Sequence, residues 1–185
     1  MAISSIINLG DDMEHYIPDM YQESIFTIDY NLLKTRGIKC LLWDLDNTIA
    51  LVGASKPSKP VIDLFEKLKK QKFKLILFSN SNKKRLEPFK KILKVDCSYS
   101  CKKPKKGKFL KVIEMFNYKL SEVAIIGDQI MTDVVGGNRV GITTILIKPL
   151  SKKDGFWTKF NRMRERKILK KLSKKNILKR GHYYE

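Results

Sequence analysis

The chain has few residues of the kinds that build disulfide frameworks or zinc sites, and it lacks long apolar runs. Three cysteines cannot all pair, and their spacing gives neither a Cys-x-x-Cys pair nor a zinc set with nearby histidines. The apolar runs fall far below the roughly 20 residues that span a bilayer, and the N-terminus has no basic-then-apolar signal peptide. We therefore expect a cytoplasmic protein whose thiols are buried or idle.

The sequence also lacks internal repeats and low-complexity linkers. At 185 residues and 43% hydrophobic, it can bury the core of one ordinary domain. We expect this domain over residues 1–150, with the packing of residues 1–30 left open because that stretch has no clear period. A basic helical tail is expected over residues 151–185.

Short apolar runs alternate with segments of helical periodicity through the middle of the chain. This alternation is typical of a parallel sheet covered by helices on both faces. The predicted fold class is therefore α/β, a three-layer Rossmann-like sheet. The expected strands are 39–44, 73–79, 97–100, 122–127 and 143–148, and the expected helices are 57–71, 83–93, 106–118 and about 131–139.

Two carboxylates follow the first expected strand. Asp44 and Asp46 point to the same side because side chains alternate along a strand. Close carboxylates repel, so they need a cation or a shared proton, and magnesium suits such a pair together with a substrate phosphate. A solvated turn or a helix start would also explain them. A calcium loop is excluded, because its sixth and twelfth positions would be Ile49 and Ser55.

Other expected strands end in matching polar chemistry. Ser79 and Asn80 follow one strand, and Gly127-Asp128 follow another, with Asp133 five residues on. Between them, Lys103 precedes a proline and could supply a fixed positive charge. Taken singly, these residues are also typical of a helix cap, a turn and a solvated lysine run. Strand ends of a parallel sheet share one edge, where ligands bind, and this ordered combination favours a site there.

These motifs, spanning residues 39–148, resemble those of the haloacid dehalogenase (HAD) superfamily. Its first motif is similar to Asp44-Leu45-Asp46-Asn47-Thr48 and its second to Ser79 after a strand. Lys103 corresponds to the third motif, and Gly127-Asp128 with Asp133 to the fourth.

The resemblance implies a phosphatase that works through an aspartyl phosphate. Asp44 would be the nucleophile, and Asp46 would protonate the leaving oxygen and then activate water. Ser79 and Lys103 would hold the phosphoryl oxygens, with Thr48 and Asn80 also binding substrate. Mg²⁺ would be bound by Asp44, the carbonyl of Asp46, Asp128 and, more weakly, Asp133. An acid at the second position favours phosphatases over the family's ion pumps.

The spacing of the motifs leaves no room for a cap domain. Thirty residues separate Thr48 from Ser79 and 23 separate Ser79 from Lys103, and a helix with its connections uses each gap. Such an open site favours large or surface-bound substrates. The chain also resembles the YqeG-like subfamily of subclass IIIA, related to phosphatidylglycerophosphate phosphatases, through "SIFTIDYNLLKTRGIKCLLWDLDNTI", "KKPKKGKF", "GDQIMTDVVGGNRVG" and "FWTKFNRMRERKIL". This resemblance implies phosphatidylglycerophosphate as the substrate.

The positive charge is unevenly distributed. Of the net +19, the 38 residues from Lys148 onward carry +11. Three interpretations stay open for this tail. Phe156, Trp157, Phe160 and Met163 could dock on the domain, the cations could contact an anionic membrane, or they could bind nucleic acid. The alternative to a phosphatase is accordingly a nucleic-acid or ribosome-associated protein with a little-used site.

Overall fold

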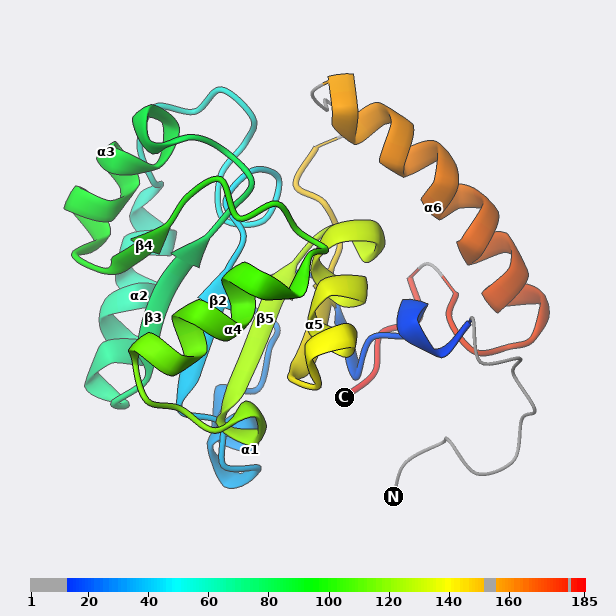
Figure 1. The fold of residues 1–185 in the computed structure, drawn as a ribbon, viewed down its shortest axis with the longest axis horizontal. Coiled ribbons are helices and arrows are strands. Elements are labelled where there is room, and N and C mark those ends of the chain that lie inside the picture. Colours follow the sequence, from blue (N-terminus) through cyan, green and yellow to red (C-terminus); the bar gives the residue numbers. More distant parts are fainter. Residues whose placement is uncertain (1–12, 152–155, 180) are drawn as a thin grey trace.

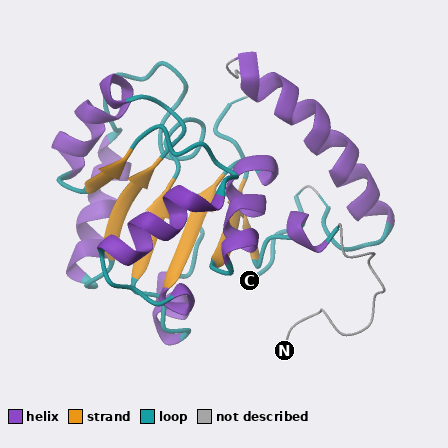
Figure 2. Cartoon of the chain, viewed as in Figure 1, coloured by secondary structure: helices purple, strands orange, loops and turns teal. Residues whose placement is uncertain are grey.

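The protein folds around one six-stranded parallel sheet (Figures 1 and 2). The computed structural model describes residues 13–151, 156–179 and 181–185, without the side chains of residues 156–162. The strand order is β1-β6-β5-β2-β3-β4. The strands are β1 (Met20–Gln22), β2 (Cys40–Trp43), β3 (Lys74–Phe78), β4 (Asp96–Ser98), β5 (Val123–Gly127) and β6 (Thr143–Ile147).

Helices cover both faces of this sheet. Behind the sheet in Figure 1 lie α1 (Tyr30–Thr35), α2 (Lys59–Lys70) and α3 (Lys83–Leu93), and in front lie α4 (Lys106–Met115) and α5 (Val135–Val140). Short helical segments are η2 (Glu14–Tyr16), η3 (Leu120–Glu122) and the π-helical η4 (Ile130–Val134). The expected fold class is thus confirmed, and no cap domain interrupts the described residues.

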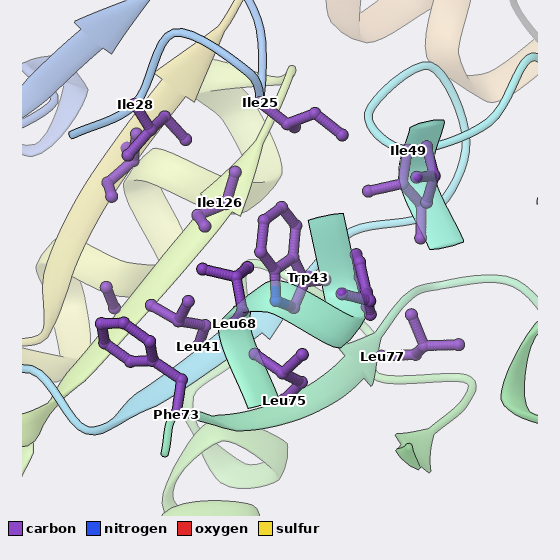
Figure 3. Close-up of a cluster of buried hydrophobic side chains, with 14 of the residues drawn as sticks. Ile25, Ile28, Leu41, Trp43, Ile49, Leu68, Phe73, Leu75, Leu77 and Ile126 are labelled. Carbon is purple, nitrogen blue, oxygen red and sulfur yellow. The ribbon is translucent and has the colours of Figure 1, made fainter. Parts of the chain in front are cut away.

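The alternation of side chains along the strands creates a core on each face. Leu41 and Trp43 of β2 belong to the larger core, which includes Phe65 of α2 and is drawn in Figure 3. The intervening residues of β2, Cys40 and Leu42, point to the other core. The central strands β2 and β5 are therefore apolar throughout, as expected for a sheet buried on both faces.

Segments from both ends of the described chain lie at the β1 edge of the sheet. The edge strand β1 pairs with β6, and Tyr21 in β1 exchanges two backbone hydrogen bonds with Tyr184. The last helix, α6 (Phe156–Lys174), runs alongside this flank (Figure 1). Its Leu172 is fully buried among side chains of η4, β1 and β6. The C-terminal segment is therefore in contact with the element that follows β5.

Of the four tail residues expected to dock on the domain, Met163 is the one whose side chain lies among the described residues. The side chains of Phe156, Trp157 and Phe160 lie outside the described residues, whereas Met163 is half exposed. Further along α6, Ile168, Leu169 and Leu172 pack on the domain. No helix among the described residues is both apolar enough and long enough to cross a bilayer.

Candidate active site

The polar residues expected at the strand ends meet at the carboxyl edge of the sheet. Asp44 directly follows β2, Asp128 directly follows β5, and Asp133 lies in η4. Each offers a carboxylate oxygen, and these three atoms all lie within 4.8 Å of one another, with all three residues buried. This cluster arises because β2 and β5 are adjacent parallel strands whose ends coincide.

Lys103 joins two members of the cluster. Its Nζ lies 2.6 Å from an oxygen of Asp44 and 2.6 Å from an oxygen of Asp133, and it donates to the carbonyl of Phe78 at 3.0 Å. All three charged side chains are almost completely buried. A buried ion pair survives only when its charges are compensated, and here one ammonium bridges two carboxylates.

Burial and charge shift the proton affinities of this cluster. Desolvation raises the pKa of Asp44 to about 6, although Lys103 pulls it down. For Lys103, burial alone would lower the pKa, but the adjacent carboxylates of Asp133 and Asp44 outweigh burial and raise it. The lysine is therefore held as a cation, which suits it to binding an anion.

Thr48 and Asn80, both expected to bind substrate, contact other site residues. The fully buried Thr48 donates its hydroxyl to Asp128 at 3.2 Å. The side chain of Asn80 accepts from the backbone N–H of Lys103 at 2.7 Å and donates to its carbonyl at 3.2 Å. Asn80 thus fixes the loop that carries the lysine. Ser79 is buried at the end of β3, where its hydroxyl accepts from the N–H of Ser81.

Asp46 lies in a different environment from the one its sequence position suggests. From the sequence, Asp46 is expected to pair with Asp44 and to need a cation or a shared proton there. In the structure, one oxygen of Asp46 instead accepts hydrogen bonds from the guanidinium of Arg85, and the other accepts one from the hydroxyl of Ser81. Neither partner is predicted from the sequence, because a serine and an arginine beside a lysine run are typical of a helix start. Their positions just after the Ser79 strand are the one signal that could have found them.

Fold and site together define a class of protein. A family model for haloacid dehalogenase-like hydrolases matches residues 14–141. The chain belongs to this family, and the HAD-type phosphatase expected from the motifs is confirmed as the enzyme class.

The particular relatives agree with this assignment. The chain is 37% identical over 160 residues to the protein named probable phosphatase YqeG of Bacillus subtilis (strain 168), covering 86% of this chain and 93% of the relative. It is 27% identical over 186 residues to phosphatidylglycerophosphate phosphatase 1 of Arabidopsis thaliana, chloroplastic/mitochondrial. That match covers 95% of this chain and 53% of the plant protein, so the chain spans about half of that relative's length.

Solved structures share the fold at low identity. A predicted HAD-like family hydrolase from Porphyromonas gingivalis has a TM-score of 0.52 and 15% identity, covering 69% of this chain and 98% of that one. An uncharacterized protein from Listeria monocytogenes serotype 4b has a TM-score of 0.51 and 17% identity, covering 64% and 85%. These likenesses support the architecture.

Proposed function

We propose that the protein is a Mg²⁺-dependent phosphomonoester hydrolase that works through an aspartyl phosphate on Asp44. The observation that carries the proposal is the buried cluster of Asp44, Asp128, Asp133 and Lys103 at the carboxyl edge of the sheet. Phosphoryl transfer depends mainly on positioning and on neutralising charge. A fixed lysine beside a carboxylate nucleophile supplies both requirements.

The reaction has two steps. An oxygen of Asp44 attacks phosphorus, the bond from phosphorus to the ester oxygen breaks, and Asp46 gives that oxygen a proton. Water then attacks the phosphorus, the bond to Asp44 breaks, and Asp46 receives a proton from the water. Lys103 and Ser79 would hold the phosphoryl oxygens. Thr48 and Asn80 are also expected to bind substrate. Thr48 would do so alongside Asp128, which accepts its hydroxyl, and Asn80 alongside Lys103, whose backbone it binds.

The carboxylate cluster fits a hard divalent cation. Its donors are oxygens, they converge within 4.8 Å, and carboxylates outnumber the ammonium three to one. Asp44, Asp128 and Asp133 would hold Mg²⁺ through carboxylates, and Asp46 would contribute its backbone carbonyl. When bound, the cation would neutralise charge on the phosphoryl group.

For the substrate, we propose phosphatidylglycerophosphate or another large or surface-bound phosphate ester. The uncapped site and the relative in Arabidopsis thaliana support this choice. Two apolar side chains of the loop that follows Asp46, Leu51 and Val52, are 51% and 44% exposed. Such residues suit contact with a lipid surface, and we propose that the cytoplasmic protein acts at the inner face of the membrane.

The test is phosphate release from phosphatidylglycerophosphate in mixed micelles, with Mg²⁺ or with EDTA. We expect release with Mg²⁺, none with EDTA and none from Asp44→Asn. A wild type that cleaves only a soluble aryl phosphate would overturn the lipid assignment and keep the mechanism. Inactivity on both substrates, together with salt-sensitive RNA binding that survives Asp44→Asn, would favour the nucleic-acid-binding alternative.

A further inference from the structure

The carboxylate of Asp46 is held on both of its oxygens. One oxygen accepts from Arg85, at 3.1 Å from Nε and 2.7 Å from Nη2. The other accepts from the hydroxyl of Ser81 at 2.9 Å. Asp46 is 26% exposed and Arg85 is 21% exposed at the side chain, so this pair lies at the mouth of the site rather than in its interior.

Arg85 also holds the loop that follows Asp46. It donates to the carbonyl of Ala54 through Nη1, and to the carbonyl of Leu51 through Nη2 at 3.3 Å. Its guanidinium lies 4.9 Å from the ring centroid of Phe89, one turn further along α3. A planar guanidinium with five donors can make such contacts at once, which the single ammonium of lysine cannot.

We propose that Arg85 is a positioning residue that fixes the carboxylate of Asp46 for both of its proton transfers. The proposal rests on the proposed function. Proton transfer requires the carboxylate within hydrogen-bond reach of the reacting oxygen. A carboxylate on a partly exposed loop can rotate away from that point, and displacements of about 1 Å can cost on the order of 100-fold in rate. Arg85 prevents this rotation by joining the loop, the carboxylate and α3.

The two proton transfers can be separated by the choice of leaving group. 4-Nitrophenolate leaves without being protonated, so formation of the aspartyl phosphate from 4-nitrophenyl phosphate makes little use of Asp46. Attack of water on that intermediate still requires Asp46 to take a proton. Misplacing the carboxylate should therefore slow the second step selectively, and the intermediate should accumulate.

The experiment compares wild type with Arg85→Gln on 4-nitrophenyl phosphate in the presence of Mg²⁺. We expect kcat to fall about ten-fold, with KM falling in parallel so that kcat/KM changes less than two-fold. A burst of nitrophenol, absent from wild type, should precede the steady state. For sn-glycerol 3-phosphate, whose leaving oxygen needs the proton, kcat/KM itself should fall about ten-fold.

The matched controls are Lys84→Gln and Arg85→Lys. Lys84 is the neighbouring exposed cation on α3 and forms no ion pair with any described residue, so its variant should match wild type. Arg85→Lys keeps the charge but loses the several planar donors of the guanidinium. Compared with Arg85→Gln, it should show a smaller burst and a partial recovery of kcat. If Arg85→Gln fails to fold by circular dichroism, the lysine variant carries the test.

Two outcomes would overturn the role of Arg85. One is an unchanged kcat in a folded variant, and the other is an equal fall in kcat and kcat/KM without a burst, which indicates general damage to the site. The underlying phosphatase proposal fails differently. It would fail if wild type released no nitrophenol with Mg²⁺, or if Asp44→Asn retained activity.

Discussion

At the scale of single residues, the burial of Asp44 and Lys103 sets the chemistry of the site. The nucleophilic role proposed for Asp44 requires an ionised carboxylate, yet desolvation raises the pKa of Asp44 to about 6. Lys103 opposes that effect and remains charged because two carboxylates contact it. The same ammonium would then meet the incoming phosphoryl group. The site therefore holds its positive charge before any substrate arrives.

The raised pKa of Asp44 predicts an unusual dependence of stability on pH. The group titrates near 3.8 when unfolded and near 6 when folded, so between these values the folded state binds more protons. The contribution of Asp44 to the free energy of unfolding is therefore largest below pH 4 and is lost as pH rises through about 6. In EDTA, urea denaturation should show this decline for wild type relative to Asp44→Asn.

Mg²⁺ supplies the control for this experiment. A cation on the cluster stabilises the ionised carboxylate, so saturating Mg²⁺ should diminish the difference in slope between wild type and Asp44→Asn. If the two proteins have parallel pH profiles in EDTA, the raised pKa is refuted.

At the scale of elements, the segment after β5 is built around one close approach. A Cβ on Gly127 would overlap the carboxyl group of Asp133, which lies in η4. The N–H of Gln129 donates to the same carboxylate at 3.2 Å. Glycine at the end of the strand thus lets the chain return Asp133 to a position beside Asp44 and Lys103.

Gly127→Ala should therefore displace Asp133 and weaken the cation site. We expect the Mg²⁺ concentration for half-maximal activity to rise at least ten-fold, because one carboxylate donor is moved. The control is Gly107→Ala in α4, where an added Cβ meets nothing within 4 Å. That variant should bind Mg²⁺ as wild type does and gain up to about 1 kcal/mol in the free energy of unfolding. Equal Mg²⁺ dependence in both variants would refute the role of Gly127.

The elements themselves were predictable to different degrees. The helix over 83–93 was predicted with the bounds that α3 has, and the central strands were placed within a residue or two. The expected helix over 131–139 instead divides into η4 and α5. The edge strand β1 was missed, since three residues without a period carry too little pattern and form a strand only by pairing with β6.

At the scale of the whole molecule, positive charge gathers on the solvent side of α6. Its exposed cations include Lys167, Lys170, Lys171 and Lys174, whereas Leu172 faces the domain. The boundary between domain and tail at residue 150 stays a prediction. Leu172, in the tail, packs on η4, β1 and β6 of the domain. A basic face on a docked helix is suited to a flat anionic surface.

We predict salt-sensitive co-sedimentation with vesicles of anionic phospholipid and none with zwitterionic vesicles. Changing Lys167, Lys170, Lys171 and Lys174 together to Gln should weaken binding at least ten-fold, because each lysine near such a surface contributes about 1 kcal/mol. The control changes Lys67, Lys70, Lys90 and Lys91, which carry the same charge on α2 and α3. Equal loss in both sets would indicate that net charge alone drives binding.

The sequence by itself determined the fold class and the residues that compose the cluster. Alternating apolar runs and helical periods require a covered parallel sheet, and carboxyl ends of parallel strands share one edge, so Asp44, Ser79 and Asp128 were predictable together. Only the tertiary structure decided the partners. Asp46 forms an ion pair with Arg85, and Asn80 accepts a hydrogen bond from the backbone of Lys103. Such contacts depend on side-chain directions between elements distant in sequence, which local periodicity does not specify.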